Sequence, residues 1–250
     1  MTRIIAVASQ KGGTAKTTTT ITLASELARL GKKVLALDLD PQGHLIEGFG
    51  TQANSLSREL SLALDGKIPL KDVLIAIREN LDLGPTNIRL AHLEPYLITR
   101  TKREDRLKFA LAPIVGDYDV VLIDCPPSLG ILTVNAFSVA NEVLVPMAGE
   151  FFALIGVSLL METLEQMRVE LNPELTVLGV LPTKINRTRH AQEVIEQARD
   201  EIGQTIRFFE PIPEAVAVRD ASAAGLPVTE YAPQSPASVA YRKLAEEVLG

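Results

Sequence analysis

The sequence contains few of the residues that metal, redox and disulfide proteins depend on. Its 250 residues include one cysteine, Cys125, three histidines and no tryptophan. A single cysteine excludes an internal disulfide and leaves no Cys-x-x-Cys pair for a metal or an iron–sulfur cluster. We interpret Cys125 as a small packed residue beside a strand. The histidines His44, His92 and His190 show no ligand spacing, so we expect structural or surface roles for them.

Long apolar segments and an excess of positive charge are also missing. No apolar run approaches the roughly 20 residues that a membrane-spanning helix needs, and the N-terminal residues do not resemble a signal peptide. We therefore expect a cytoplasmic protein. The 25 Lys and Arg residues stand against 31 Asp and Glu residues, which gives a net charge of −6. This balance argues against a surface that coats DNA uniformly, but it leaves room for a local basic patch.

Apolar, strand-like runs alternate with helical stretches along the whole sequence. A hydrophobic content of 46% in 250 residues is enough for a substantial core, and no linker interrupts it, so we expect one domain over residues 1–250. The alternation predicts an α/β fold, with a mostly parallel, twisted sheet covered by helices on both faces. The clearest predicted strands are 3–9, 33–39, 119–124, 142–147 and 176–181.

A glycine loop lies between the first predicted strand and a helical pattern over residues 17–30. Backbone N–H groups in such a turn point inward and bind phosphate, and the helix N-terminus favours the same negative charge. We expect Lys16 to reach the β- and γ-phosphates of a nucleotide and the Thr17 hydroxyl to bind Mg²⁺. The candidate nucleotide-binding residues of the loop are Lys11, Gly12, Gly13, Thr14, Ala15, Lys16, Thr17 and Thr18.

The loop departs from the generic phosphate-binding pattern, because Gln10 and Ala15 stand where that pattern has glycine. On that pattern alone it could be an ordinary glycine-containing turn with surface lysines. If the backbone of Ala15 needs a positive φ, alanine costs roughly 1 kcal/mol or more there, whereas a helical φ removes the penalty.

The order Lys-Gly-Gly-x-x-Lys-Thr resembles the deviant Walker A box of the ParA/MinD ATPases, a family with a P-loop NTPase fold. The early lysine, Lys11 here, is the signature residue of that family. The resemblance implies that Lys11 reaches across a dimer interface to the nucleotide of the partner subunit. It therefore implies ATP or ADP with Mg²⁺ as cofactors, a homodimer in the ATP state, and catalytic roles for Lys11 and Lys16.

Two carboxylates end the second predicted strand, at Asp38 and Asp40, just before Pro41. Their spacing of two places both on the same face of the strand. The carboxyl ends of strands in a doubly wound sheet face the ligand, so we expect both beside Mg²⁺ and the γ-phosphate. The segment resembles the Asp-x-Asp-Pro-Gln box of the family, in which the second aspartate positions or activates the attacking water. The alternative is a strand-terminating Asp-Pro turn.

A third apolar strand ends in Asp124, in the form of a Walker B strand whose aspartate holds Mg²⁺ through its water shell. We therefore expect Thr17, Asp38 and Asp124 at the metal, and Asp40 as the third catalytic residue. These residues suit the transfer of a phosphoryl group to water, which depends on positioning and charge neutralisation.

The resemblance to short ParA proteins extends along nearly the whole chain, and the helix-turn-helix domain of longer plasmid ParA proteins is not part of this sequence. It implies nonspecific DNA binding once ATP has joined two subunits, through basic residues late in the chain. The candidates are Lys184, Arg187, Arg189 and Arg219.

Two further residues match positions near the nucleotide base in relatives. Asn186 corresponds to an asparagine that recognises adenine, and Pro213 lies in the loop that covers the base. A structural turn role is the alternative for both. Glu214 and Ala217 occupy a stretch in which chromosomal relatives often carry extra arginines.

Three functions are compatible with these sequence features. The first is an ATP-dependent DNA-binding dimer, associated with the nucleoid, that partitions or positions cargo with a ParB-like adaptor that stimulates weak hydrolysis. The second is a MinD-like ATPase that cycles on a membrane. We expect no membrane partner, because residues 241–250 contain paired glutamates and predict a helix that docks on the core rather than a basic amphipathic helix. The third is a metabolic enzyme on the same fold, such as a reductase component or an ATP-dependent ligase.

Overall fold

A single sheet of seven strands organises the computed structural model, which describes residues 1–149, 153–186 and 188–250. The strand order is β3-β4-β2-β5-β1-β6-β7, and every neighbouring pair is parallel except β3 with β4. The mostly parallel α/β fold predicted from the sequence is therefore confirmed. The strands are β1 (Arg3–Val7), β2 (Val34–Asp38), β3 (Ile75–Arg78), β4 (Leu81–Gly84), β5 (Val120–Asp124), β6 (Glu142–Ala148) and β7 (Thr176–Thr183).

The five predicted strands are all present, and β3 and β4 are two strands that the sequence analysis did not identify. They form an antiparallel hairpin at one edge of the sheet, and each has only four residues. Asn80, in the turn between them, has a φ of +62°. Asparagine tolerates this left-handed conformation better than most residues, so the turn chemistry fits the hairpin.

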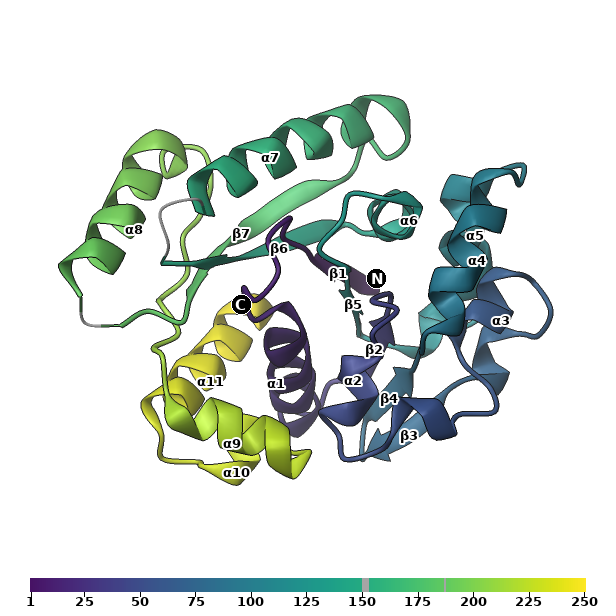
Figure 1. Cartoon of the computed structure of the whole chain (residues 1–250), viewed down its shortest axis with the longest axis horizontal. Coiled ribbons are helices and arrows are strands. Elements are labelled where there is room, and N and C mark those ends of the chain that lie inside the picture. The colour runs from purple at the N-terminus through teal and green to yellow at the C-terminus, as the bar shows by residue number, and fades with distance from the viewer. Residues whose placement is uncertain (150–152, 187) are drawn as a thin grey trace.

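Helices cover both faces of the sheet (Figure 1). One hydrophobic cluster lies between the sheet and α3 to α8, and a second lies between the sheet and α1, α2 and α9 to α11. The helices are α1 (Lys16–Arg29), α2 (His44–Glu47), α3 (Leu60–Leu64), α4 (Arg89–Ile98), α5 (Arg106–Leu111), α6 (Ile131–Val139), α7 (Ala153–Glu170), α8 (Arg189–Ile202), α9 (Val216–Ala224), α10 (Val228–Tyr231) and α11 (Pro236–Leu249).

The central strands are buried on both faces, which explains their continuous apolar sequences. In β1, Ile4 and Ala6 belong to the cluster on one face, and Ile5 belongs to the cluster on the other. Successive side chains of a strand point to opposite faces, so each strand contributes to both clusters.

The C-terminal helix α11 packs beside α1 (Figure 1). Its apolar stripe is buried, and the hydroxyl of the buried Tyr241 is hydrogen-bonded to the Thr19 hydroxyl of α1 at 3.1 Å. The prediction of a core-docking helix is therefore confirmed. No helix in the described ranges is both long and apolar enough to cross a membrane.

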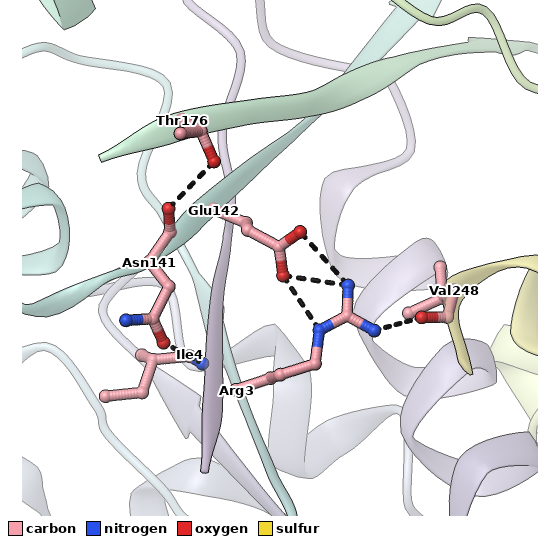
Figure 2. A network of polar contacts seen from close by, with 6 residues as sticks. All are labelled: Arg3, Ile4, Asn141, Glu142, Thr176 and Val248. Carbon is pink, nitrogen blue, oxygen red and sulfur yellow. Dashed lines mark hydrogen bonds and ion pairs between the residues drawn. The ribbon is translucent and has the colours of Figure 1, made fainter. Parts of the chain in front are cut away.

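A polar network joins the amino ends of β1 and β6 to the end of α11 (Figure 2). The Arg3 guanidinium forms an ion pair with Glu142 at 2.8 Å and donates to the Val248 carbonyl. The Ile4 N–H donates to the Asn141 side chain at 2.8 Å. These contacts hold together the amino ends of the strands. The glycine loop lies at the opposite side of the sheet, because it follows the carboxyl end of β1.

Candidate nucleotide site

The glycine loop and the predicted carboxylates meet at the carboxyl ends of three adjacent strands. In the sheet register, Asp124 of β5 stands opposite Asp38 on one side and opposite Val7, the last residue of β1, on the other. The loop that follows Val7 therefore begins beside Asp124, and Asp38 lies one strand further along the sheet. This is the edge at which ligands bind in open α/β sheets.

The loop is a compact turn built around the carbonyl group of Lys11. The Thr14 hydroxyl and the Lys16 ammonium both donate to this carbonyl, each at 3.3 Å. Lys16 is 7% exposed, and Thr17 and Thr18 are half-buried in the first turn of α1. Lys16 is thus placed by the loop itself. Gly12 is exposed, and a Cβ atom there would meet nothing within 4 Å.

The backbone at Gly13 and Ala15 is left-handed, with φ values of +78° and +65°. Glycine adopts this conformation without strain because it has no Cβ atom, whereas the Cβ atom of Ala15 makes it strained. Of the two possibilities that the sequence left open for Ala15, the structure shows the positive φ. Ala15 immediately precedes α1, so the strain is located where the phosphate loop turns into the helix.

Asp124 is the residue best suited to a cation. It is fully buried, its Oδ1 accepts a hydrogen bond from Thr20 at 3.4 Å, and its Oδ2 has no hydrogen-bond partner among the described residues. Burial raises the pKa of Asp124 to about 7, while the Thr17 hydroxyl and the Lys16 charge lower it. A buried carboxylate oxygen without a partner is costly, and a divalent cation would satisfy it.

The two aspartates of the β2 segment have different surroundings. Asp38 is fully buried, and its two oxygens accept from the N–H groups of Asp40 at 3.0 Å and Leu45 at 3.1 Å. Burial, followed by the charge of Asp124, raises the pKa of Asp38 well above its ordinary value. Asp40 is half-buried, and its Oδ1 accepts from the Gln42 N–H at 3.0 Å. Asp38 thus organises the turn, and Asp40 lies nearer to solvent.

The side chains at this edge suit Mg²⁺ bound together with phosphate oxygens. Within the described ranges, no group of three or more His, Cys, Asp or Glu side chains is arranged to hold a metal ion. Mg²⁺ commonly uses one or two carboxylates together with waters and substrate phosphates, so Asp124 and Thr17 fit such a site. Burial lowers the pKa of Lys16, and the charge of Asp124 opposes this effect.

Cys125 follows Asp124 and is buried, with its thiol directed at the Ile123 carbonyl at 3.8 Å. Burial, and then the charge of Asp124, raises the pKa of the thiol far above its ordinary value. A thiol that resists ionisation is a poor nucleophile. Cys125 is therefore a packed residue, as the sequence indicated.

The predicted DNA-binding residues belong to different segments. Lys184 follows β7, and Arg219 is exposed on α9. Arg189 is the first residue of α8, but its side chain lies outside the described part of the chain, as does the whole of Arg187. The Lys184 ammonium lies 4.0 Å from the position that a Cβ atom would take at Gly13, so it approaches the phosphate loop.

Asn186 and Pro213 belong to segments that lie side by side. An isolated parallel bridge joins Ile185 to Pro213. The Asn186 Oδ1 accepts from the Thr188 N–H at 3.2 Å and thereby forms the turn that precedes α8. The structure thus shows the turn role for Asn186, and its contact with adenine stays a prediction.

Two threonines that were not predicted from the sequence also support the site. The Thr183 hydroxyl, at the end of β7, donates to the Thr14 carbonyl at 2.9 Å across 169 residues of sequence. Thr20 donates both to the Lys16 carbonyl and to Asp124. Its position four residues after Lys16, one helical turn along α1, was a usable signal. No local pattern marks Thr183.

Comparison with known proteins identifies the family. Residues 2–177 match the family described as AAA domain. The chromosome-partitioning ATPase Soj of Thermus thermophilus is 42% identical over 250 residues, which cover 99% of this chain and 95% of the relative. The chromosome partitioning protein ParA of Caulobacter vibrioides is 40% identical over 251 residues, with 99% and 94% covered. The chain belongs to the Soj/ParA family.

A solved structure similar to this Soj/ParA-family chain comes from Mycobacterium smegmatis and is named cobyrinic acid a,c-diamide synthase with bound ADP and magnesium. It is 38% identical, has a TM-score of 0.88, and the match covers 100% of this chain and 94% of the other. The P-loop NTPase fold implied by the resemblance to the ParA/MinD ATPases is therefore confirmed. The Soj/ParA-family chain carries its phosphate loop and its Asp124 strand within the matched region.

Proposed function

We propose that this Soj/ParA-family chain is a weak, Mg²⁺-dependent ATPase that partitions or positions cargo. The observation that carries the proposal is the placement of the buried, unpartnered Asp124 oxygen beside the loop that holds Lys16. The partitioning ATPases among its relatives support the same class of function. The cargo is a plasmid, a chromosome or a protein assembly.

Each residue at the strand edge has a role in this proposal. Lys16 and the N–H groups of the loop bind the phosphates of ATP, and Thr17 and Asp124 hold the metal. When bound, Mg²⁺ would neutralise charge on the phosphate oxygens. Asp40 orients the attacking water, because its carboxylate is the half-buried one beside the site. Asp38 keeps this segment folded through its two backbone hydrogen bonds.

The chain would act as an ATP-dependent dimer on DNA. Lys11 contacts the nucleotide of the partner subunit and thereby couples ATP to dimer formation. The dimer binds DNA nonspecifically through basic residues that include Arg187, Arg189 and Arg219, so it associates with the nucleoid. Phosphate contacts position a protein on DNA without reading its sequence. A ParB-like adaptor then stimulates hydrolysis and releases the dimer locally.

The test is DNA retardation at low salt with ATP, with ADP and without nucleotide. We expect retardation with ATP alone, and a matched Arg219→Ala variant should lose most of it while it still binds ATP. Equal retardation without nucleotide, or no retardation with ATP, would refute ATP-dependent DNA binding.

A membrane-cycling function is less well supported, because α11 uses its apolar stripe to pack on α1. An amphipathic helix needs that stripe at the lipid interface. We expect no pelleting with anionic liposomes in the presence of ATP. Strong ATP-dependent pelleting would favour the membrane function instead.

The likeness to the Mycobacterium smegmatis protein supports a second candidate, ATP-dependent amide synthesis. A synthase that takes its nitrogen from glutamine uses a reactive nucleophile such as a cysteine thiolate. The one cysteine of this sequence is buried, and its pKa is raised. ATP turnover that rises with a corrinoid acid and an ammonia donor, and not with DNA and adaptor, would favour this candidate.

A further inference from the structure

Lys184 has an unusual backbone conformation at the end of β7. Its φ is +54°, in the left-handed region that is strained for a residue with a Cβ atom. Such strain persists only where the surrounding structure enforces it, and it concentrates at functional sites. The surroundings of Lys184 must therefore enforce its strained backbone.

The contacts on both sides of Lys184 enforce this conformation. On one side, the buried Thr183 is hydrogen-bonded to the Thr14 carbonyl of the phosphate loop at 2.9 Å. On the other side, the Ile185 N–H donates to the Ile212 carbonyl at 3.1 Å, and the Ile185 carbonyl accepts from the Glu214 N–H at 3.0 Å. Lys184 is thus held between the phosphate loop and the segment that leads to α9.

The result of this geometry is that the Lys184 side chain turns toward the phosphate loop. Its Nζ lies 4.0 Å from the position of a Cβ atom at Gly13, and Gly13 itself is left-handed. Within the described ranges, Lys184 forms no ion pair with a carboxylate. An ammonium group beside an anion-binding turn adds to the positive potential there.

We propose that Lys184 binds the phosphate chain of the nucleotide, as a third lysine of the site beside Lys11 and Lys16. This inference rests on the proposed function only in that the chain must bind ATP or ADP. It replaces the prediction that Lys184 is a DNA contact, because the Lys184 ammonium group lies at the phosphate loop.

The test is the affinity for ADP, measured by equilibrium titration with a fluorescent ADP in the presence of Mg²⁺ and without DNA. Lys184→Gly should weaken ADP binding about 10- to 100-fold, the range expected for the loss of one charge-assisted hydrogen bond. The same variant should melt at a higher temperature without nucleotide, because glycine relieves the left-handed strain. Lys184→Arg, which keeps the positive charge, should recover most of the affinity.

Lys102→Gly is the matched control, because Lys102 is also exposed and has a φ of +52° far from the loop in sequence. It should raise the melting temperature and leave the ADP affinity unchanged. Unchanged ADP affinity in Lys184→Gly would overturn the inference, and a loss of DNA retardation in that variant would then identify Lys184 as a DNA contact. A wild-type chain that binds no ADP would overturn the proposed function together with this inference.

Discussion

Replacing Ala15 by glycine should stabilise the protein, which is the reverse of the usual effect of an alanine-to-glycine change. Ala15 has a φ of +65° and a ψ of 28°, so its Cβ atom is held in the left-handed region. Relief of this strain is worth roughly 1–2 kcal/mol in the folded state. Glycine also gives the unfolded chain more freedom, which subtracts about 0.4–1 kcal/mol.

The net effect of Ala15→Gly is therefore an increase of about 0–1.6 kcal/mol in the free energy of unfolding, or about 0.8 kcal/mol at the midpoints of the two ranges. For a chain of 250 residues this midpoint corresponds to a rise of about 2–3 °C in the melting temperature. The assay is thermal unfolding without nucleotide, followed by circular dichroism. ADP affinity should be unchanged or higher, because the loop keeps its conformation at a lower cost.

Ala223→Gly is the matched control, since Ala223 is exposed within the helix α9. Glycine in place of alanine costs up to about 1 kcal/mol in a helix and less in the last turn, where Ala223 lies, so this variant should melt at a slightly lower temperature. If Ala15→Gly destabilises the chain as much as Ala223→Gly does, the backbone of Ala15 is helical and the strain argument is wrong.

Three further predictions concern the buried carboxyl group of Asp124, the buried hydrogen bond between Tyr241 and Thr19, and the polar network around Arg3. Asp124 holds its proton more tightly in the folded state (pKa about 7, against 3.8), so the folded chain binds more protons than the unfolded chain between about pH 4 and 7. Without nucleotide, the free energy of unfolding should fall as pH rises through this window, by at most about 1.4 kcal/mol per pH unit, and urea titrations of Asp124→Asn should show a flatter profile. Tyr241→Phe leaves the buried Thr19 hydroxyl without its partner and should cost about 1–2 kcal/mol in urea unfolding, whereas the exposed Tyr231→Phe should cost less than about 0.5. Equal costs for the two tyrosine variants would exclude a role for the hydroxyl contact. Arg3→Met removes the partly exposed network of Figure 2 and should lower the free energy of unfolding by only about 0.5–1 kcal/mol. It should also increase amide hydrogen exchange at the end of α11. Unchanged exchange there would show that the network does not hold this helix.

The central part of the fold could be predicted because its strands are buried on both faces. Such strands read as continuous apolar runs; β2 and β5 each end at an aspartate, and β1 is followed directly by the glycine loop. The hairpin strands β3 and β4 were missed because each has only four residues, too few to give a clear period, and β3 at the edge is partly exposed. The available signal was the asparagine at position 80 between them, a residue type common in tight turns.

The site could be predicted where its residues are close in sequence and not where they meet across the fold. The loop and the carboxylates follow directly from motifs at strand ends. The approach of Lys184 to Gly13 depends on the position of β7 in the sheet and on two left-handed residues, and neither is encoded in a local pattern. The same limit applies to Ala15, because composition alone does not determine the sign of φ.

The central proposal is that ATP binding joins two subunits into a dimer through Lys11. The oligomeric state of the protein in solution tests this most directly. Sedimentation velocity of the wild type should show a dimer with Mg²⁺ and a nonhydrolysable ATP analogue and a monomer with Mg²⁺ and ADP. Lys11→Ala should bind the analogue and remain a monomer, because it lacks the side chain that contacts the nucleotide of the partner. A Lys11→Ala dimer that forms as readily as the wild-type dimer would contradict the account.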